Sequence, residues 1–103
     1  MTTLLITRHP GAIEWATRRG LPIHRQVHHL DPETIRPGDV VIGTLPLNLA
    51  AQVCARGGRF YTLSLDLPPQ TRGGELSADD LERYGARLEE YRIQAVADQT
   101  ESD

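Results

Sequence analysis

The chain has 103 residues, enough for one domain with its own hydrophobic core and too few for a second lobe. Its single cysteine, Cys54, excludes an internal disulfide, and no apolar run is long enough for a secretory signal or a membrane helix. We therefore expect a cytoplasmic protein with no membrane role. The net charge is −3, and all 11 basic residues are arginines, which match phosphate oxygens through a planar fork.

The charges are distributed unevenly along the chain. Residues 1–74 carry 8 arginines and 5 acidic residues, whereas residues 75–103 carry 3 arginines and 9 acidic residues. Proteins that bind long DNA or RNA are normally basic throughout, so this pattern favours a small anionic ligand held by a local arginine cluster. We expect a single domain over residues 1–96 and a flexible acidic tail over residues 97–103.

The first part of the chain predicts a strand, a helix and an edge strand. The strand is expected from Thr3 to Ile6 or Thr7, and the helix follows with Pro10 near its first position and Gly20 just past its end. A second strand is expected from Ile23 to His28, where the alternation is only partly apolar, as is typical of a sheet edge.

The middle of the chain predicts a buried strand, a helix and another strand. A short link over residues 31–38 leads to the strand Asp39–Gly43, which is continuous and β-branched. Thr44-Leu45-Pro46 is then expected to open a helix that ends at Gly57-Gly58. A further strand is expected over residues 59–66, followed by an irregular segment over residues 68–74.

The last element is predicted to be one long helix. Ser77 and Asp80 have the spacing of a capping box, which marks a helix start. The apolar residues that follow recur in helical steps and would form a packing stripe: Leu81, Tyr84, Leu88 and Tyr91.

The order βαββαβα predicts an α/β fold, a Rossmann-like three-layer sandwich around a mostly parallel four-stranded sheet. In such a sheet the carboxyl ends of the strands meet at one edge, which is where ligands bind. Polar residues end every predicted strand: Thr7, Arg8 and His9; His28 and His29; Thr44; Ser64 and Asp66.

Arg8 and His9 are the strongest candidates for a site, because they stand where the first strand ends and a helix begins. A guanidinium and an imidazole at that point indicate a phosphate-bearing ligand. In the simpler alternative, Arg8 pairs with a surface acid and His9 only caps the helix.

Four further residues are candidate ligand contacts, and each has a simpler reading. Thr44 would contact the ligand or serve as a helix N-cap, and Asn48, with Gln52 one turn later, would read a base or ribose or be merely solvated. Asp66 would accept a ribose hydroxyl or pair with an arginine. Arg72 would clamp a phosphate or be ordinary surface.

A metal site is a weak hypothesis for this sequence. The imidazoles of His24, His28 and His29 are common zinc ligands, but the chain has a single cysteine and no His-carboxylate spacing typical of zinc sites. We expect neither a metal nor another cofactor.

Four segments in order resemble a known family: residues 7–16, 38–46, 63–68 and 74–77. They are similar to the small CRISPR-associated Csx-type proteins of type III systems, more narrowly the VVA-type family, and the resemblance covers about residues 3–93. It implies a role in cyclic oligoadenylate signalling, as a ring nuclease that linearises the messenger and so switches off the antiviral response. The expected messenger is cyclic tetra-adenylate.

The chemistry of the candidate residues agrees with that implied activity. The substrate's own 2′-OH can attack the neighbouring phosphorus, so that no metal is needed and the product ends in a 2′,3′-cyclic phosphate. We expect Arg8 to stabilise the negative charge on the phosphoryl oxygens and His9 to transfer protons. The expected ligand contacts are Thr7, Thr44, Asn48, Asp66 and Arg72. A ring of near two-fold symmetry suits a homodimer.

Two other functions fit parts of the same pattern. A sensor or sponge that binds the ring without cutting it would need the same residues. A histidine phosphatase is the remote alternative, because a strand followed by Arg-His resembles the Arg-His-Gly motif of that superfamily, although Pro10 stands in place of its glycine.

Overall fold

The computed structural model describes residues 1–7, 9–66 and 76–96, which form a five-stranded sheet with helices on both faces. The strands are β1 (Thr3–Ile6), β2 (Arg25–Val27), β3 (Val40–Gly43), β4 (Arg59–Ser64) and β5 (Arg87–Tyr91), in the spatial order β2-β1-β3-β4-β5. The first four strands are parallel, and β5 pairs antiparallel with β4. The expected α/β class and mostly parallel sheet are confirmed.

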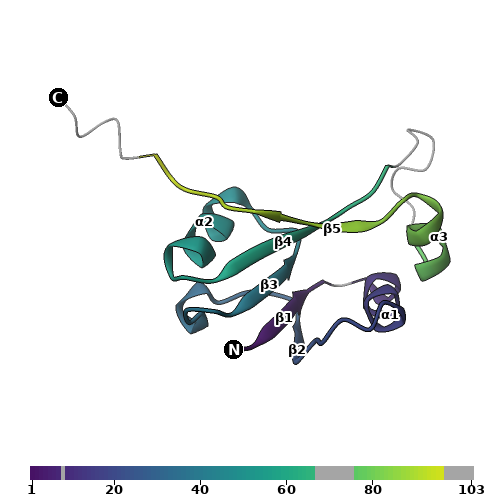
Figure 1. Ribbon diagram of the computed structural model, residues 1–103, viewed down its shortest axis with the longest axis horizontal. Coiled ribbons are helices and arrows are strands. Elements are labelled where there is room, and N and C mark those ends of the chain that lie inside the picture. The colour runs from purple at the N-terminus through teal and green to yellow at the C-terminus, as the bar shows by residue number, and fades with distance from the viewer. Residues whose placement is uncertain (8, 67–75, 97–103) are drawn as a thin grey trace.

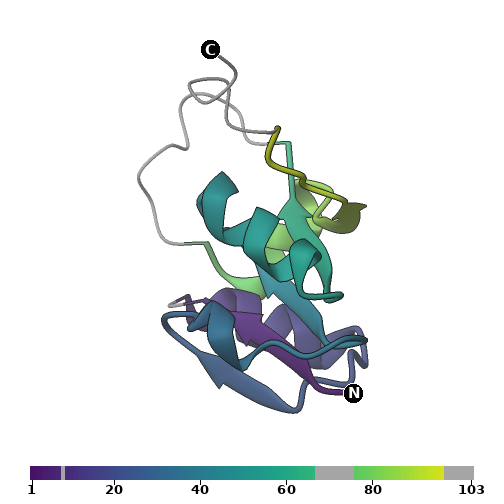
Figure 2. The ribbon, with the colours of Figure 1, turned by 90° about the vertical axis from the view of Figure 1, so that its left-hand side faces the viewer.

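The helices are α1 (Pro10–Arg18), α2 (Leu47–Ala55) and α3 (Ala78–Arg83), with a single 3-10 turn, η1, over Pro32–Thr34. In Figure 1 α1 and α3 lie to the right of the strands and α2 lies to the left. Figure 2, turned by 90°, shows α2 in front of the strands from the left-hand side. The sheet is therefore the middle of three layers.

The alternation of side chains along the strands divides the core into two clusters, one on each face. Leu5 and Ile42 point to the face of α1 and α3, where Trp15 and Leu81 pack against them. Val41, one residue earlier on β3, points to the opposite face and contacts the cluster that α2 completes with Ala50 and Val53. Central strands that are apolar on both faces explain why residues 40–43 form one continuous hydrophobic run.

The expected long final helix is wrong, and it is the main difference from the predicted four-stranded sheet. The capping box of Ser77 and Asp80 is present, but α3 ends at Arg83, and Gly85 follows with φ of +72°. That left-handed conformation favours glycine and ends the helix. The chain then pairs with the free edge of β4, which places Leu88 opposite Leu63 on the α1 face.

The spacing of the apolar residues does not distinguish one long helix from a short helix that is followed by a strand. Leu81 and Leu88 are seven residues apart, which suits one helix stripe, but both also reach the same core when a turn and a strand separate them. The unpaired edge of β4 decides the outcome, because antiparallel pairing satisfies backbone groups that a longer helix would leave to solvent.

The other predicted elements are confirmed with shifts at their ends. Strand β2 is indeed an edge strand but only three residues long, and β4 ends at Ser64 rather than Asp66. Helix α1 has Pro10 at its first turn and Gly20, with φ of +70°, beyond its end. The short link between β2 and β3 crosses β1 with one 3-10 turn, and Ile35 fills the core beneath it.

Gly11 fixes how α1 meets the segment that leads into α3. A Cβ atom at Gly11 would lie 2.1 Å from the carbonyl oxygen of Leu76, so any larger residue would displace backbone. The first turn of α1 therefore packs directly against residues 76–77, beside the point where β1 ends.

A candidate anion-binding groove where the sheet changes direction

The chain changes winding direction between β1 and β3. From β1 the connection through α1 leads outward to β2 over one face, whereas from β3 the connection through α2 leads the other way to β4 over the opposite face. The two helices therefore start on opposite sides of neighbouring strand ends. In open α/β sheets this point is the usual ligand-binding crevice.

Both helix N-termini at this crevice lack side-chain capping. The N-cap of α1 is His9 and that of α2 is Pro46, neither makes a side-chain cap hydrogen bond, and neither first turn holds an acidic residue. Backbone N–H groups at a helix start and the helix dipole attract anions, and nothing of opposite charge neutralises them within these turns. The crevice is thus electrostatically suited to phosphate.

A groove of about 500 Å³ lies at this crevice, and we call it the His9 groove. Its polar side chains come from the ends of three neighbouring strands: Thr7 and His9 after β1, His28 and His29 after β2, and Thr44 after β3. None of the described residues that line it is acidic. Its apolar wall consists of Ile6, Leu30, Leu45, Pro46 and Leu49.

Thr7 holds the backbone that carries His9. The His9 N–H donates to Thr7 Oγ1 at 3.1 Å, the Thr7 N–H donates to the Val27 carbonyl at 3.2 Å, and Gln26 Nε2 donates to the Thr7 carbonyl at 3.2 Å. These bonds tie the end of β1 to β2. The His9 imidazole is exposed and makes no cap hydrogen bond to α1. The alternative that His9 serves only as a helix cap therefore does not hold for its side chain.

The structure brings some of the predicted site residues together and separates others. Thr7, His9 and Thr44 share the His9 groove, and Thr44 is not an N-cap because α2 is capped at Pro46. Asn48, with Gln52, lines a different groove between α2 and the residues that follow β5. Arg8 and Arg72 lie outside the described residues.

Asp66 contacts an arginine, which is one of its two predicted roles. Its carboxylate accepts a hydrogen bond from Arg87 Nη1 at 3.4 Å, and its N–H donates to the Tyr84 carbonyl at 2.8 Å. Arg87 comes from β5, the strand that the sequence did not predict, so this partner could not have been named in advance. The pairing occupies Asp66 at the opposite side of the sheet from β2.

His28 is the residue of the groove that sequence reasoning undervalued. It was considered as a metal ligand with His24, but the His24 Nδ1 accepts the Thr3 N–H at 2.9 Å, at the start of β1 rather than its end. The useful signal was the parallel pairing of β1 and β2, which brings residues 28 and 9 to the same edge. Among the described residues no group of three or more His, Cys, Asp or Glu side chains is placed to hold a metal ion.

Most acidic groups with a shifted pKa belong to ion pairs away from the groove. Hydrogen bonds from Arg18, Arg19 and Arg59 are the largest causes that lower the pKa of Asp79, Glu82 and Glu90, respectively. The first two pairs join α1 to α3, and the third joins β4 to β5. These arginines are occupied by carboxylates within the fold.

The fold and the groove define a small α/β protein with a crevice at the switch point of its sheet, where two helices begin without side-chain caps. The chain belongs to the family described as "Putative CRISPR-associated protein (Cas_VVA1548)", whose model matches residues 4–94. The resemblance noted from the four sequence segments is thereby confirmed at the level of the family. No match to the chain was found among curated proteins or among solved structures.

The family description names no reaction and no ligand. None of the helices in the described part of the chain has the length and hydrophobicity that crossing a bilayer requires.

Proposed function

We propose that the protein is a ring nuclease of type III CRISPR signalling, which binds and linearises a cyclic oligoadenylate, with cyclic tetra-adenylate as the preferred substrate. The observation that carries the proposal is the His9 groove, in which imidazoles meet two uncapped helix N-termini. Membership of a CRISPR-associated family supports the signalling context. A compact crevice suits a small closed ring of phosphodiesters better than an extended polynucleotide.

The proposed reaction uses the substrate's own 2′-hydroxyl as the nucleophile. The 2′-oxygen loses its proton and attacks the adjacent phosphorus, and the bond from phosphorus to the 5′-oxygen breaks. The leaving 5′-oxygen takes up a proton. The products are a linear oligoadenylate with a 5′-hydroxyl and a 2′,3′-cyclic phosphate, and the reaction needs neither a metal nor a protein nucleophile.

This reaction requires two proton transfers, and the groove offers more than one imidazole for them. We assign one transfer to His9 and the other to His28, since both side chains line the same groove. A positioned acid or base contributes about 10²–10⁴-fold to rate. The helix N-termini and Arg8 stabilise the phosphoryl oxygens, and Thr7 and Thr44 contact the neighbouring ribose or phosphate.

The remaining predicted contacts belong to the parts of the ligand beyond the reacting phosphate. Asn48 on α2 and Arg72 would hold ribose, base or an adjacent phosphate of the same ring. Because one domain presents one such groove, we propose that two copies enclose the ring as a homodimer in the cytoplasm. Light scattering should then report about twice the chain mass, and a monomer both free and with ring bound would contradict the dimer.

The proposal is tested by incubating excess protein with cyclic tri-, tetra- and hexa-adenylate in EDTA and separating the products by chromatography. We expect cyclic tetra-adenylate to be converted to linear products with 2′,3′-cyclic phosphate ends. Activity that disappears in EDTA and returns with one metal would overturn the mechanism. Tight binding without any linear product would instead identify a sensor or sponge, which needs the same groove.

A further inference from the structure

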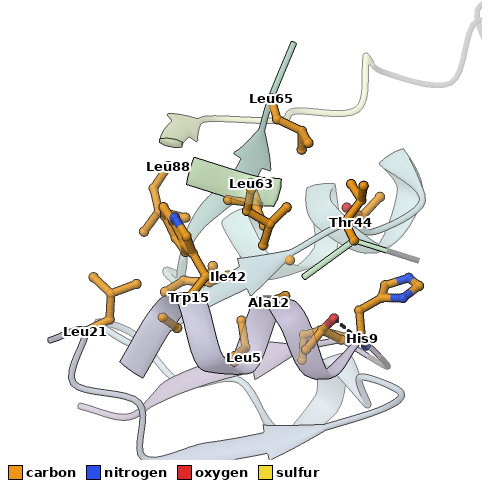
Figure 3. A pocket seen from close by; sticks show the side chains of 16 residues that line it. Leu5, His9, Ala12, Trp15, Leu21, Ile42, Thr44, Leu63, Leu65 and Leu88 are labelled. Carbon is orange, nitrogen blue, oxygen red and sulfur yellow. Dashed lines mark hydrogen bonds between the residues drawn. The ribbon is translucent and has the colours of Figure 1, made fainter. Parts of the chain in front are cut away.

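A second, apolar cavity lies beside the His9 groove. It has a volume of about 210 Å³, is partly open to solvent, and is lined by α1, α3 and the face of the sheet that they cover, with leucines as its commonest lining residues. Figure 3 shows Leu63 and Leu65 above it, Leu5 and Ala12 below it, and Trp15, Leu21 and Leu88 at its far end. Packed protein cores rarely leave a void of this size.

The cavity and the His9 groove adjoin each other at the ends of β1 and β3. Thr7, His9 and Thr44 line both of them, together with Ile6. In Figure 3 His9 and Thr44 stand at the end of the cavity opposite Trp15 and Leu21. A ligand whose phosphate lies in the groove would therefore have the mouth of an apolar cavity next to it.

The size and chemistry of the cavity fit one flat, largely apolar group. Pockets for complete small-molecule ligands usually measure about 300–1,000 Å³, so this cavity accommodates a portion of a ligand rather than a whole ring. The faces of a purine are apolar and stack on aromatic side chains, and Trp15 supplies an indole within the wall.

The Trp15 indole N–H is buried close to the Glu82 carboxylate of α3. Trp15 is 3% exposed, and its Nε1 makes no hydrogen bond within the described structure. The Glu82 carboxylate lies near enough for the indole to contribute to its lowered pKa, although hydrogen bonding from Arg19 is the largest cause.

We propose that this cavity is a base pocket, which receives one adenine of the cyclic oligoadenylate while the attached phosphodiester lies in the His9 groove. The inference rests on the proposed function for the identity of the ligand. It adds how the protein would select that ligand. An apolar pocket recognises the size and stacking surface of the base, so purine rings are favoured over pyrimidine rings.

The chain offers a direct reporter, because Trp15 is its single tryptophan. The probe is the 2′-deoxy form of cyclic tetra-adenylate, which lacks the attacking hydroxyl and so stays intact. We expect it to change the Trp15 emission saturably, with the same Kd that calorimetry reports. The 2′-deoxy cyclic tetra-uridylate should bind more weakly, by about tenfold or more.

Ala12→Leu tests the position of the base, since Ala12 lines the cavity from α1 and the larger side chain would occupy it. We expect the adenylate ring to bind about ten- to hundredfold more weakly, and the preference over the uridylate ring to disappear. The matched control is Thr17→Leu, on the exposed face of the same helix, which should bind as the parent does. Leu65→Phe, at the half-buried end of the cavity beyond β4, provides a second filling variant if Ala12→Leu does not fold.

The outcomes separate this inference from the proposed function. If the parent cleaves cyclic tetra-adenylate while Trp15 emission stays constant through saturation, or if a folded filling variant binds like the parent, the base-pocket proposal is overturned and the ring nuclease proposal stands. If the parent neither binds nor cleaves any cyclic oligoadenylate, both proposals fail.

Discussion

The groove between β1 and β3 differs from the region around α3 and β5 in how helix N-termini are capped and how charged side chains are paired. At α3 the helix start is closed by a capping box, in which Ser77 Oγ accepts the Asp80 N–H and Asp80 accepts the Ser77 N–H, both at 3.1 Å. At α1 and α2 the N-caps provide no side-chain acceptor. The capped helix start is satisfied within the fold, whereas the two uncapped ones face a groove.

The charged residues show the same contrast. Around α3 and β5 arginines meet carboxylates: Arg18 and Arg19 bind Asp79 and Glu82 of α3, and Arg87 binds Asp66. The described residues of the His9 groove include imidazoles and hydroxyls but no carboxylate. Polar groups that satisfy one another stabilise a structure, whereas the exposed side chains of His9 and Thr44 at the switch point are available to a ligand.

The largest expected effect comes from removing either proposed proton-transfer group. His9→Ala and His28→Ala should each lower the single-turnover rate of ring cleavage by about 10²-fold or more, with nearly unchanged ring affinity.

His24→Ala is the matched control for these histidines. His24 accepts a backbone N–H from Thr3 at the far end of β1, so its removal should lower the melting temperature and leave the rate of the folded fraction intact. A His9 variant that melts at a lower temperature but cleaves at the parent's rate would show that His9 has a structural role.

The second-largest effect is expected at Arg8, where two substitutions distinguish a two-pronged guanidinium contact from a simple positive charge. Arg8→Ala should weaken ring binding by about ten- to hundredfold, since hydrogen bonds to charged groups are worth about 1.5–3 kcal/mol, and Arg8→Lys should recover only part of it. Calorimetric titration with the uncleavable ring measures this. If the Arg8→Ala variant binds and cleaves like the parent, the ligand does not bind at the end of β1.

A buried carboxylate in the structural part of the sheet should make stability depend on pH. Asp39 is buried, and its carboxylate accepts hydrogen bonds from the backbone N–H groups of Arg36 and Thr2. These bonds lower its pKa, with the bond from Arg36 as the largest cause. This contribution is present above the unfolded-state pKa of about 3.9 and is lost as the pH falls through the lower folded-state value.

Asp39→Ala should therefore destabilise the protein by about 1–3 kcal/mol near neutral pH and by less in acid, as measured by urea unfolding at several pH values. A loss of stability that is the same at every pH would show that the lowered pKa is not its origin.

The smallest effect is expected at the cap of α3. Ser77→Ala should cost about 1 kcal/mol, because it removes the acceptor for the Asp80 N–H, and it should leave cleavage unchanged. Thermal unfolding and the single-turnover assay together decide this. A change in rate without a change in stability would show that the cap of α3 serves catalysis, and it would weaken the contrast between the two regions.

The local signals in the sequence located the parallel strands, α1, α2 and the start of α3, because helix punctuation and β-branched runs act over a few residues. They failed over residues 84–91, where a heptad-like spacing hid a turn at Gly85 and a strand. That strand forms only because β4 has a free edge, and such a condition is set by topology rather than by the strand's own residues.

The candidate site was predictable to the same extent. Strand ends that converge at one edge indicated Thr7, His9 and Thr44, and the structure places them in one groove. The pairing of Asp66 with Arg87 depends on the unforeseen strand, and the value of His28 depends on which strand lies beside β1. Contacts between distant segments were thus the part that sequence patterns could not supply.

The central claim is that the ligand binds where β1 and β3 end, and backbone amide NMR shifts upon titration with 2′-deoxy cyclic tetra-adenylate test it most directly. We predict that the largest changes fall within residues 6–13 and 43–49, with His28 among the next largest and with small changes over residues 90–95. Largest changes along the groove between α2 and residues 90–95, with the ends of β1 and β3 unaffected, would contradict the account.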